Sequence, residues 1–131
     1  MTKTAIPYGF WPSDWTAEDA ASASCDFAEL RAGHGGVFWV QYDPADVRST
    51  LWYWHARGLR SLTPPGFSLR SRVYEYGGGA FCLTDAGVAF VNEQDQQIYL
   101  QGLSTDAATP PIALTDDDAC RYGDLQFDTR Q

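Results

Sequence analysis

The chain has 131 residues, a formal net charge of −8 and an isoelectric point near 4.4. This acidity argues against nucleic acid and anionic membrane surfaces as partners, because both require a basic face. Hydrophobic residues make up 44% and aromatic residues 15% of the sequence, which excludes a disordered chain. Five Trp, seven Tyr and seven Phe are many rings for the interior of one small domain, so their placement is the first question.

The first 23 residues predict a lead-in followed by one short helix. Residues 16–21 favour a helix with Thr16 as N-cap and Asp19 as the acidic partner of a capping box. No run of signal-peptide length lies near the start, and no stretch approaches the length of a membrane helix.

The three cysteines lack the spacing of a disulfide framework or a metal knuckle. They are Cys25, Cys82 and Cys120. We therefore expect reduced thiols that pack in the core, and a cytoplasmic protein.

From residue 24 onward, short β-prone runs alternate with Gly, Pro, Asp and Asn, which favours an all-β antiparallel fold. Gly87 permits a three-residue hairpin loop at residues 85–87. Residues 34–36 hold the same place between two earlier predicted strands. The predicted strands are 25–30, 37–42, 50–55, 59–63, 79–84, 88–92, 97–101, 112–115 and 124–128.

These runs repeat. Residues 27–30 align with 80–83, 37–40 with 88–91, 51–53 with 98–100, and 60–64 with 112–116. A period of about 50 residues with four strands per unit is typical of a β-propeller blade. The predicted fold is therefore a partial β-propeller (24–131), with blade one at about 24–64, blade two at about 79–116 and the start of blade three at about 122–131. A compact two-sheet sandwich that happens to repeat is the alternative.

Two blades and one strand cannot close a ring. Each blade of a propeller buries its faces against two neighbours. We expect the domain to be incomplete, with aromatic faces that await other blades or further copies of the chain. Alternation places Trp52 and Trp54 on one strand face and Tyr53 on the other, and packing explains them better than carbohydrate stacking.

At residues 70–79 the sequence reads RSRVYEYGGG, which resembles the R-x-R-V-x-E-Y-G-G-G segment of prolyl-oligopeptidase-family (S9) serine peptidases. The resemblance is to the branch of dipeptidyl aminopeptidases and acylaminoacyl-peptidases. Further segments agree in order, with departures at Ser68, Leu69, Gln97, Ile98 and Gly123: residues 7–13 (PYGFWPS), 62–70 (LTPPGFSLR), 90–99 (FVNEQDQQIY) and 121–124 (RYGD).

The resemblance implies an N-terminal propeller, usually seven-bladed, followed by an α/β-hydrolase domain with a Ser-Asp-His triad. Such a propeller covers the active site, admits short peptides and supplies some substrate contacts. The expected role is thus a non-catalytic scaffold and gate. The expected partners are the other blades, the hydrolase domain and, in the parent protein, a peptide. A stand-alone β-sheet module that self-associates through exposed blade faces is the alternative.

The chain shows no catalytic machinery of its own. It contains no G-x-S-x-G nucleophile elbow, and His34 and His55 fall at a hairpin turn and a strand end. The acidic run 116–118 indicates a solvated turn rather than a calcium loop. We expect no cofactor and no metal.

The candidate substrate-binding residues are Glu75 and Arg72. The resemblance implies that a carboxylate at this place binds the free amino group of a peptide. The alternative is that Glu75 pairs with Arg70 or Arg72 and fixes the crossover between blades. The other residues of this structural segment are Arg70, Tyr76, Gly77, Gly78 and Gly79.

Overall fold

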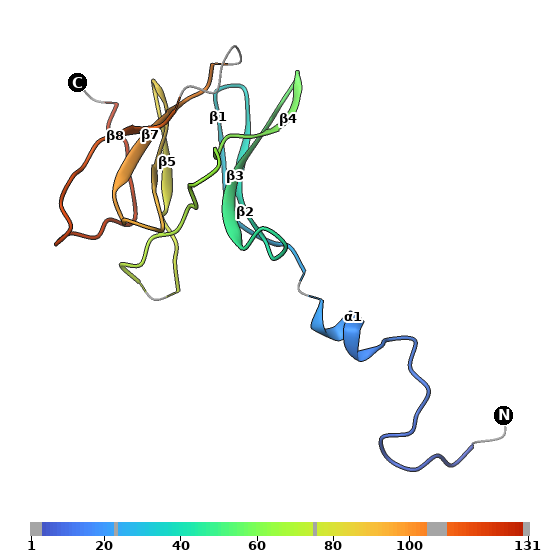
Figure 1. The fold of residues 1–131 in the computed structure, drawn as a ribbon. Helices are drawn as coiled ribbons and strands as arrows, with labels where there is room; N and C mark the ends of the chain where they lie inside the picture. Colours follow the sequence, from blue (N-terminus) through green and yellow to red (C-terminus); the bar gives the residue numbers. More distant parts are fainter. Residues whose placement is uncertain (1–3, 23, 75, 105–109, 130–131) are drawn as a thin grey trace.

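The computed structural model describes residues 4–22, 24–74, 76–104 and 110–129, and it consists of two four-stranded antiparallel sheets and one short helix (Figure 1). Sheet 1 contains β1 (Asp26–Gly33), β2 (Gly36–Asp43), β3 (Arg48–His55) and β4 (Gly58–Ser61). Sheet 2 contains β5 (Phe81–Thr84), β6 (Gly87–Val91), β7 (Ile98–Gly102) and β8 (Ile112–Ala113). Each sheet is a meander in chain order, which confirms the predicted partial, blade-like all-β fold.

The helix α1 (Ala17–Ala21) begins at the predicted cap. The Thr16 hydroxyl accepts a hydrogen bond from the Asp19 amide at 3.0 Å, and the Asp19 carboxylate accepts one from the Thr16 amide at 2.9 Å. The helix buries no residue, and the N-terminal segment runs away from both sheets (Figure 1). Among the described residues, no helix is both long and apolar enough to cross a lipid bilayer.

The strand register confirms most of the predicted repeat. Leu51 lies opposite Val40 in sheet 1, and Ile98 lies opposite Val91 in sheet 2, as the alignment of 51–53 with 98–100 requires. The last strands agree in the same way, since β4 pairs with β3 and β8 with β7 at corresponding positions. The two sheets are therefore copies of one unit at the level of individual residue pairs.

The first strands of the two units differ by a β-bulge. In sheet 1 the register shifts between Ala28 and Arg31, whereas β5 pairs with β6 without a shift. Glu29, within the bulge, has a φ of +54°. The bulge adds one residue to the strand. In the observed register Ala28, and not the aligned Phe27, occupies the place of Ala80, and Arg31, not the aligned Glu29, occupies the place of Cys82. The predicted alignment of 27–30 with 80–83 is therefore wrong by one residue before the bulge and by two after it.

The hydrophobic core lies between the two sheets. The rings of Phe38 and Tyr53 stack with centroids 4.2 Å apart, and they face Phe81 and Phe90 of sheet 2. The buried core cluster is Phe38, Val40, Leu51, Tyr53, Leu69, Phe81, Val88 and Phe90. Strand β6 is buried along its whole length, so part of the aromatic surplus is absorbed at the sheet–sheet interface.

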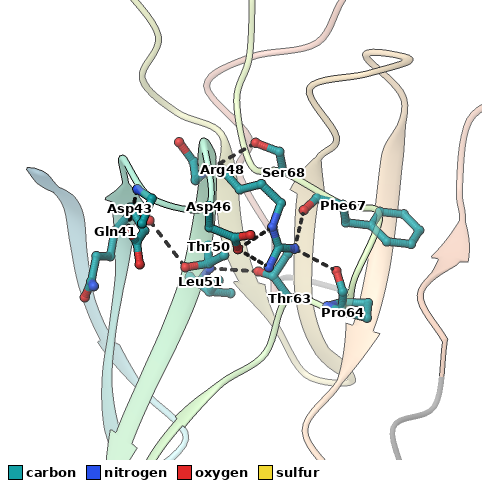
Figure 2. A network of polar contacts seen from close by, with 12 residues as sticks. Gln41, Asp43, Asp46, Arg48, Thr50, Leu51, Thr63, Pro64, Phe67 and Ser68 are labelled. Atoms are coloured by element: carbon teal, nitrogen blue, oxygen red, sulfur yellow. Dashed lines mark hydrogen bonds and ion pairs between the residues drawn. The ribbon is translucent and has the colours of Figure 1, made fainter. Parts of the chain in front are cut away.

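The segment between β4 and β5, residues 62–80, is the crossover segment. Figure 2 shows how Arg48 at the start of β3 holds it: its guanidinium donates to the carbonyl oxygens of Pro64 and Phe67 at 3.2 and 3.1 Å. The Thr63 hydroxyl accepts from the Leu51 amide at 2.8 Å, and the Ser68 hydroxyl accepts from the Ser49 amide at 3.1 Å (Figure 2). These bonds fix the crossover segment along one edge of the core.

Residues 124–128, predicted as a strand, lie on the side of sheet 2 away from sheet 1 and form no ladder among the described residues (Figure 1). The Leu125 amide donates to the Gly79 carbonyl at 3.2 Å. Gly79 approaches so closely that an added Cβ would lie 2.4 Å from Asp124 Cα. A strand needs a ladder of backbone hydrogen bonds to a neighbouring strand, and this one bond to Gly79 does not make a ladder.

Candidate functional site

A cavity of about 380 Å³ opens where the crossover segment meets β1 and β2. Arg70, Tyr76, Gly77 and Gly78 line it from the crossover segment. Sheet 1 contributes Asp26, Ala28, Glu29, Val40, Tyr42 and Ser49. The structure thus brings four residues of the predicted segment together with two carboxylates that sequence reasoning had not selected.

Glu29 anchors the glycine-rich end of the crossover segment. Its two carboxylate oxygens lie 3.0 and 3.3 Å from the amide nitrogen of Ala80, which donates to them. Ala80 is buried, and a buried backbone N–H needs a partner. The bulge in β1 is what places the Glu29 side chain there, so this contact had no signal in the sequence pattern.

Arg70 and Arg72 share one described carboxylate partner, Glu93. The guanidinium of Arg72 lies 3.3 Å and that of Arg70 lies 3.8 Å from the same Glu93 oxygen. The Ser68 hydroxyl donates to the other oxygen at 2.7 Å. Glu75, the expected partner or substrate contact, lies outside the described residues. Because both arginine side chains are at least half exposed, each ion pair contributes at most about 1 kcal/mol.

Gln96 fixes the backbone between the two arginines. Its amide oxygen accepts from the Arg72 N–H at 2.7 Å, and its amide nitrogen donates to the carbonyls of Arg70 and Glu93 at 3.1 and 2.9 Å. Gln96 is buried and has a φ of +60°. Sequence reasoning gave it no role, although it lies within residues 90–99, one of the ordered segments that carry the family resemblance.

The glycine run is a chain of left-handed backbone conformations. Gly77, Gly78 and Gly79 have φ values of +76°, +105° and +61°, which glycine adopts without steric cost. Space around Gly77 and Gly78 is open, and close approach occurs at Gly79 alone among the three. Tyr76 stands almost fully exposed at the rim of the cavity.

Both histidines occupy the predicted turn and strand end, and each contacts backbone. His34 Nε2 lies 2.8 Å from the Thr84 carbonyl, and His55 Nδ1 accepts from the Arg57 amide at 3.0 Å. Within the described ranges, no group of three or more His, Cys, Asp and Glu side chains is placed to hold a metal ion.

The prediction that the cysteines pack in the core is wrong for two of the three. Cys82 is buried, whereas Cys25 and Cys120 are exposed, because both lie outside the strands that face the core. Burial raises the pKa of the Cys82 thiol, against a smaller opposing effect of Arg31. A hydrogen bond to Asp117 raises the pKa of the Cys120 thiol. A raised pKa disfavours the nucleophilic thiolate at both positions.

The two sheets, their meander topology and their shared core define a part of a blade-like β protein. No protein-family model matches the chain, and no curated protein matches it. Among solved structures, the chain is similar to a puromycin-hydrolyzing peptidase from Mycobacterium tuberculosis, with 27% sequence identity and a TM-score of 0.71. The match covers 86% of this chain and 18% of the peptidase chain. The chain therefore resembles one part of a much longer peptidase.

Proposed function

We propose that this chain is part of the β-propeller of an S9-type serine peptidase, of the dipeptidyl aminopeptidase or acylaminoacyl-peptidase kind. The observation that carries the proposal is the structural similarity to a peptidase over 86% of the chain. The S9 branch rests on the resemblance of residues 70–79 and of the four ordered segments around them.

In this proposal the chain is a non-catalytic scaffold and gate for an α/β-hydrolase domain. The absence of a G-x-S-x-G pentapeptide in the sequence and the backbone contacts of His34 and His55 support a non-catalytic role. The partners are further blades and the hydrolase domain, and the parent protein acts on peptides. The three free cysteines agree with a reducing compartment, and we place the protein in the cytoplasm.

The proposal assigns substrate contacts to Glu75 and Arg72. The cavity lined by Arg70, Tyr76, Gly77 and Gly78 of the same segment supports this, since its volume lies within the range of small-ligand sites and its lining combines carboxylates with the Arg70 guanidinium. Charged groups of both signs suit the two ends of a short peptide.

The test begins with the coding sequence on both sides of these 131 codons. We expect an open frame that adds further β-repeats and a G-x-S-x-G motif. The full-length product should hydrolyse aminoacyl, dipeptidyl or acylaminoacyl nitroanilides, and the 131-residue chain should not. A frame without a hydrolase domain would overturn the proposal, as would labelling of a serine in the 131-residue chain by a fluorophosphonate probe.

A second candidate function is a stand-alone β-sheet module that self-associates. The observation that favours it is exposure of apolar side chains on the outer sheet faces, including Phe27, Leu30 and Trp54. A stop codon directly after codon 131 would support this candidate over the first.

A further inference from the structure

The peptide group between Gly79 and Ala80, here called the junction peptide, is hydrogen-bonded on both of its sides. Its N–H donates to the Glu29 carboxylate of sheet 1 at 3.0 Å. Its carbonyl oxygen accepts from the Leu125 amide at 3.2 Å. Leu125 belongs to residues 122–127, here called the docked segment, which follow sheet 2 in the chain. One peptide group therefore stands between a strand of sheet 1 and a segment beyond sheet 2.

The two bonds of the junction peptide support each other. A peptide group whose N–H donates to a carboxylate is polarised, so its carbonyl oxygen becomes a stronger acceptor. Glu29 also orients the peptide plane, because both of its carboxylate oxygens lie within hydrogen-bond distance of the Ala80 nitrogen. The glycine run before Ala80 restrains this plane weakly, since Gly77 and Gly78 have open space around them. The plane therefore depends on its hydrogen bonds.

The docked segment can open without unfolding the sheets. Two hydrogen bonds join its backbone to the crossover segment, the bond of Leu125 to Gly79 and a bond that the Ser71 hydroxyl donates to the Tyr122 carbonyl. It forms no strand ladder within the described ranges. A segment held by so few backbone bonds opens at a lower free energy than the whole molecule. Docking and opening of this segment form a two-state equilibrium that its contacts bias.

We propose that Glu29 is a positioning residue that acts through the junction peptide and holds the docked segment against sheet 2. Among the described residues, the hydrogen bonds of the Glu29 side chain go to the Ala80 amide, so the effect on the segment is indirect. The inference goes beyond both proposed functions and holds for either. Because Glu29 also lines the cavity, one contact controls a wall of the candidate site and the cover of sheet 2.

The test measures hydrogen exchange at single amides of the 131-residue chain by NMR. In Glu29→Ala, exchange at the Leu125 amide should speed up about tenfold, the factor expected for the loss of one hydrogen bond to a charged group. Glu29→Gln keeps an acceptor and should leave the Leu125 amide close to its wild-type rate. Alkylation of the buried Cys82 thiol should follow the same order, because Cys82 lies beneath Leu125 and Phe127 on the outer face of sheet 2.

Thr63→Val is the matched control. The Thr63 hydroxyl is also the side-chain acceptor of a buried backbone amide, that of Leu51, and it lies away from the junction peptide. This variant should speed up exchange at the Leu51 amide and leave the Leu125 amide unchanged. Glu29→Ala should do the reverse, which separates opening of the docked segment from a general loss of stability.

Ser71→Ala tests the coupling in the other direction and serves as a second variant should Glu29→Ala unfold. It removes the bond to the Tyr122 carbonyl, and since coupling is reciprocal it should speed up exchange at the Ala80 amide. Unchanged exchange at Leu125 in Glu29→Ala, together with faster exchange at Ala80, would overturn the proposal. Equal acceleration at Leu51 and Leu125 in Glu29→Ala would also overturn it, because the whole molecule would then be opening.

Discussion

Sheets 1 and 2 are built from one repeated unit, yet their second strands are buried differently. Strand β6 is buried at every position, whereas β2 alternates between buried and partly exposed residues. Sheet 2 is covered by sheet 1 on one face and by residues 125–127 on the other. Sheet 1 is covered on one face. How far the side chains of a strand are buried therefore depends on the place of its sheet in the stack. This holds even where two strands, such as β2 and β6, have similar patterns of apolar residues.

The largest expected effect is a loss of stability on substitution by Ala, and it should differ between the equivalent residues Phe90 and Trp39. Phe90 is 2% exposed, so Phe90→Ala should lower the free energy of unfolding by about 3–5 kcal/mol. Trp39→Ala, on the outer face, should cost less than half of that, because water already reaches part of the ring. Urea unfolding followed by circular dichroism measures both, at a concentration where the chain is monomeric. Equal losses would show that the outer face is as well packed as the core.

A second prediction concerns the contact of the crossover segment with residues 122–127. Gly79→Ala forces a side chain into a left-handed conformation and against the backbone of Asp124, at an expected cost of about 2–3 kcal/mol. Gly77→Ala shares the positive φ but meets open space, so it is the matched control and should cost about 1 kcal/mol. Hydrogen exchange at the Leu125 amide should speed up in the first variant and not in the second. Unchanged protection of the Leu125 amide in Gly79→Ala would contradict the close approach of Gly79 to Asp124.

A third prediction tests the bulge that distinguishes sheet 1 from sheet 2. Glu29→Ala removes the acceptor of the buried Ala80 amide and should cost about 1–3 kcal/mol. Glu29→Gln keeps a neutral acceptor and should recover most of that loss. Urea unfolding gives the stabilities, and the exchange rate of the Ala80 amide reports the bond directly. A Gln variant as unstable as the Ala variant would show that the charge of Glu29, and not its hydrogen bond, stabilises the contact.

The smallest expected effect lies in the β6–β7 loop of sheet 2. Desolvation raises the pKa of Asp95, but hydrogen bonds from Tyr99, Gln97 and Asn92 outweigh it and hold the pKa below its ordinary value. The stabilisation is therefore present above the unfolded-state pKa of about 4 and is lost as the pH falls through the folded-state pKa.

The variant Tyr99→Phe removes one of these bonds and should reduce the loss of stability on acidification. The change should be under about 1 kcal/mol, because Asp95 is exposed. Thermal unfolding between neutral and acidic pH measures it, with Tyr8→Phe on the exposed lead-in as the control. An acid dependence identical to that of the wild type would contradict the assigned role of Tyr99.

Much of the fold follows from residue patterns that act over short distances. Turn residues, alternation and a period of about 50 residues predicted eight strands in two units, and the capping box predicted α1, because these depend on neighbours in the chain. The bulge at Glu29 did not follow, since one extra residue in a strand leaves no clear mark on an apolar pattern. Beyond the bulge, β1 lies one residue further from the predicted alignment than before it, and the bulge placed a carboxylate that no motif had indicated.

The sequence by itself determined the all-β class, the repeat, the strand order and the segment that contributes Arg70, Tyr76, Gly77 and Gly78 to the cavity. Only the tertiary structure decided that, among the described residues, Glu93 pairs with Arg70 and Arg72, that Cys25 and Cys120 are exposed, and that Trp54 on the outer face of sheet 1 remains exposed. The physical reason is the distance along the chain over which each kind of interaction acts. Strand formation depends on local alternation and turns, whereas charge pairing and burial depend on which distant segments cover a face. The many aromatic rings seen in the composition lie partly in the core between the two sheets and partly on the exposed outer face of sheet 1.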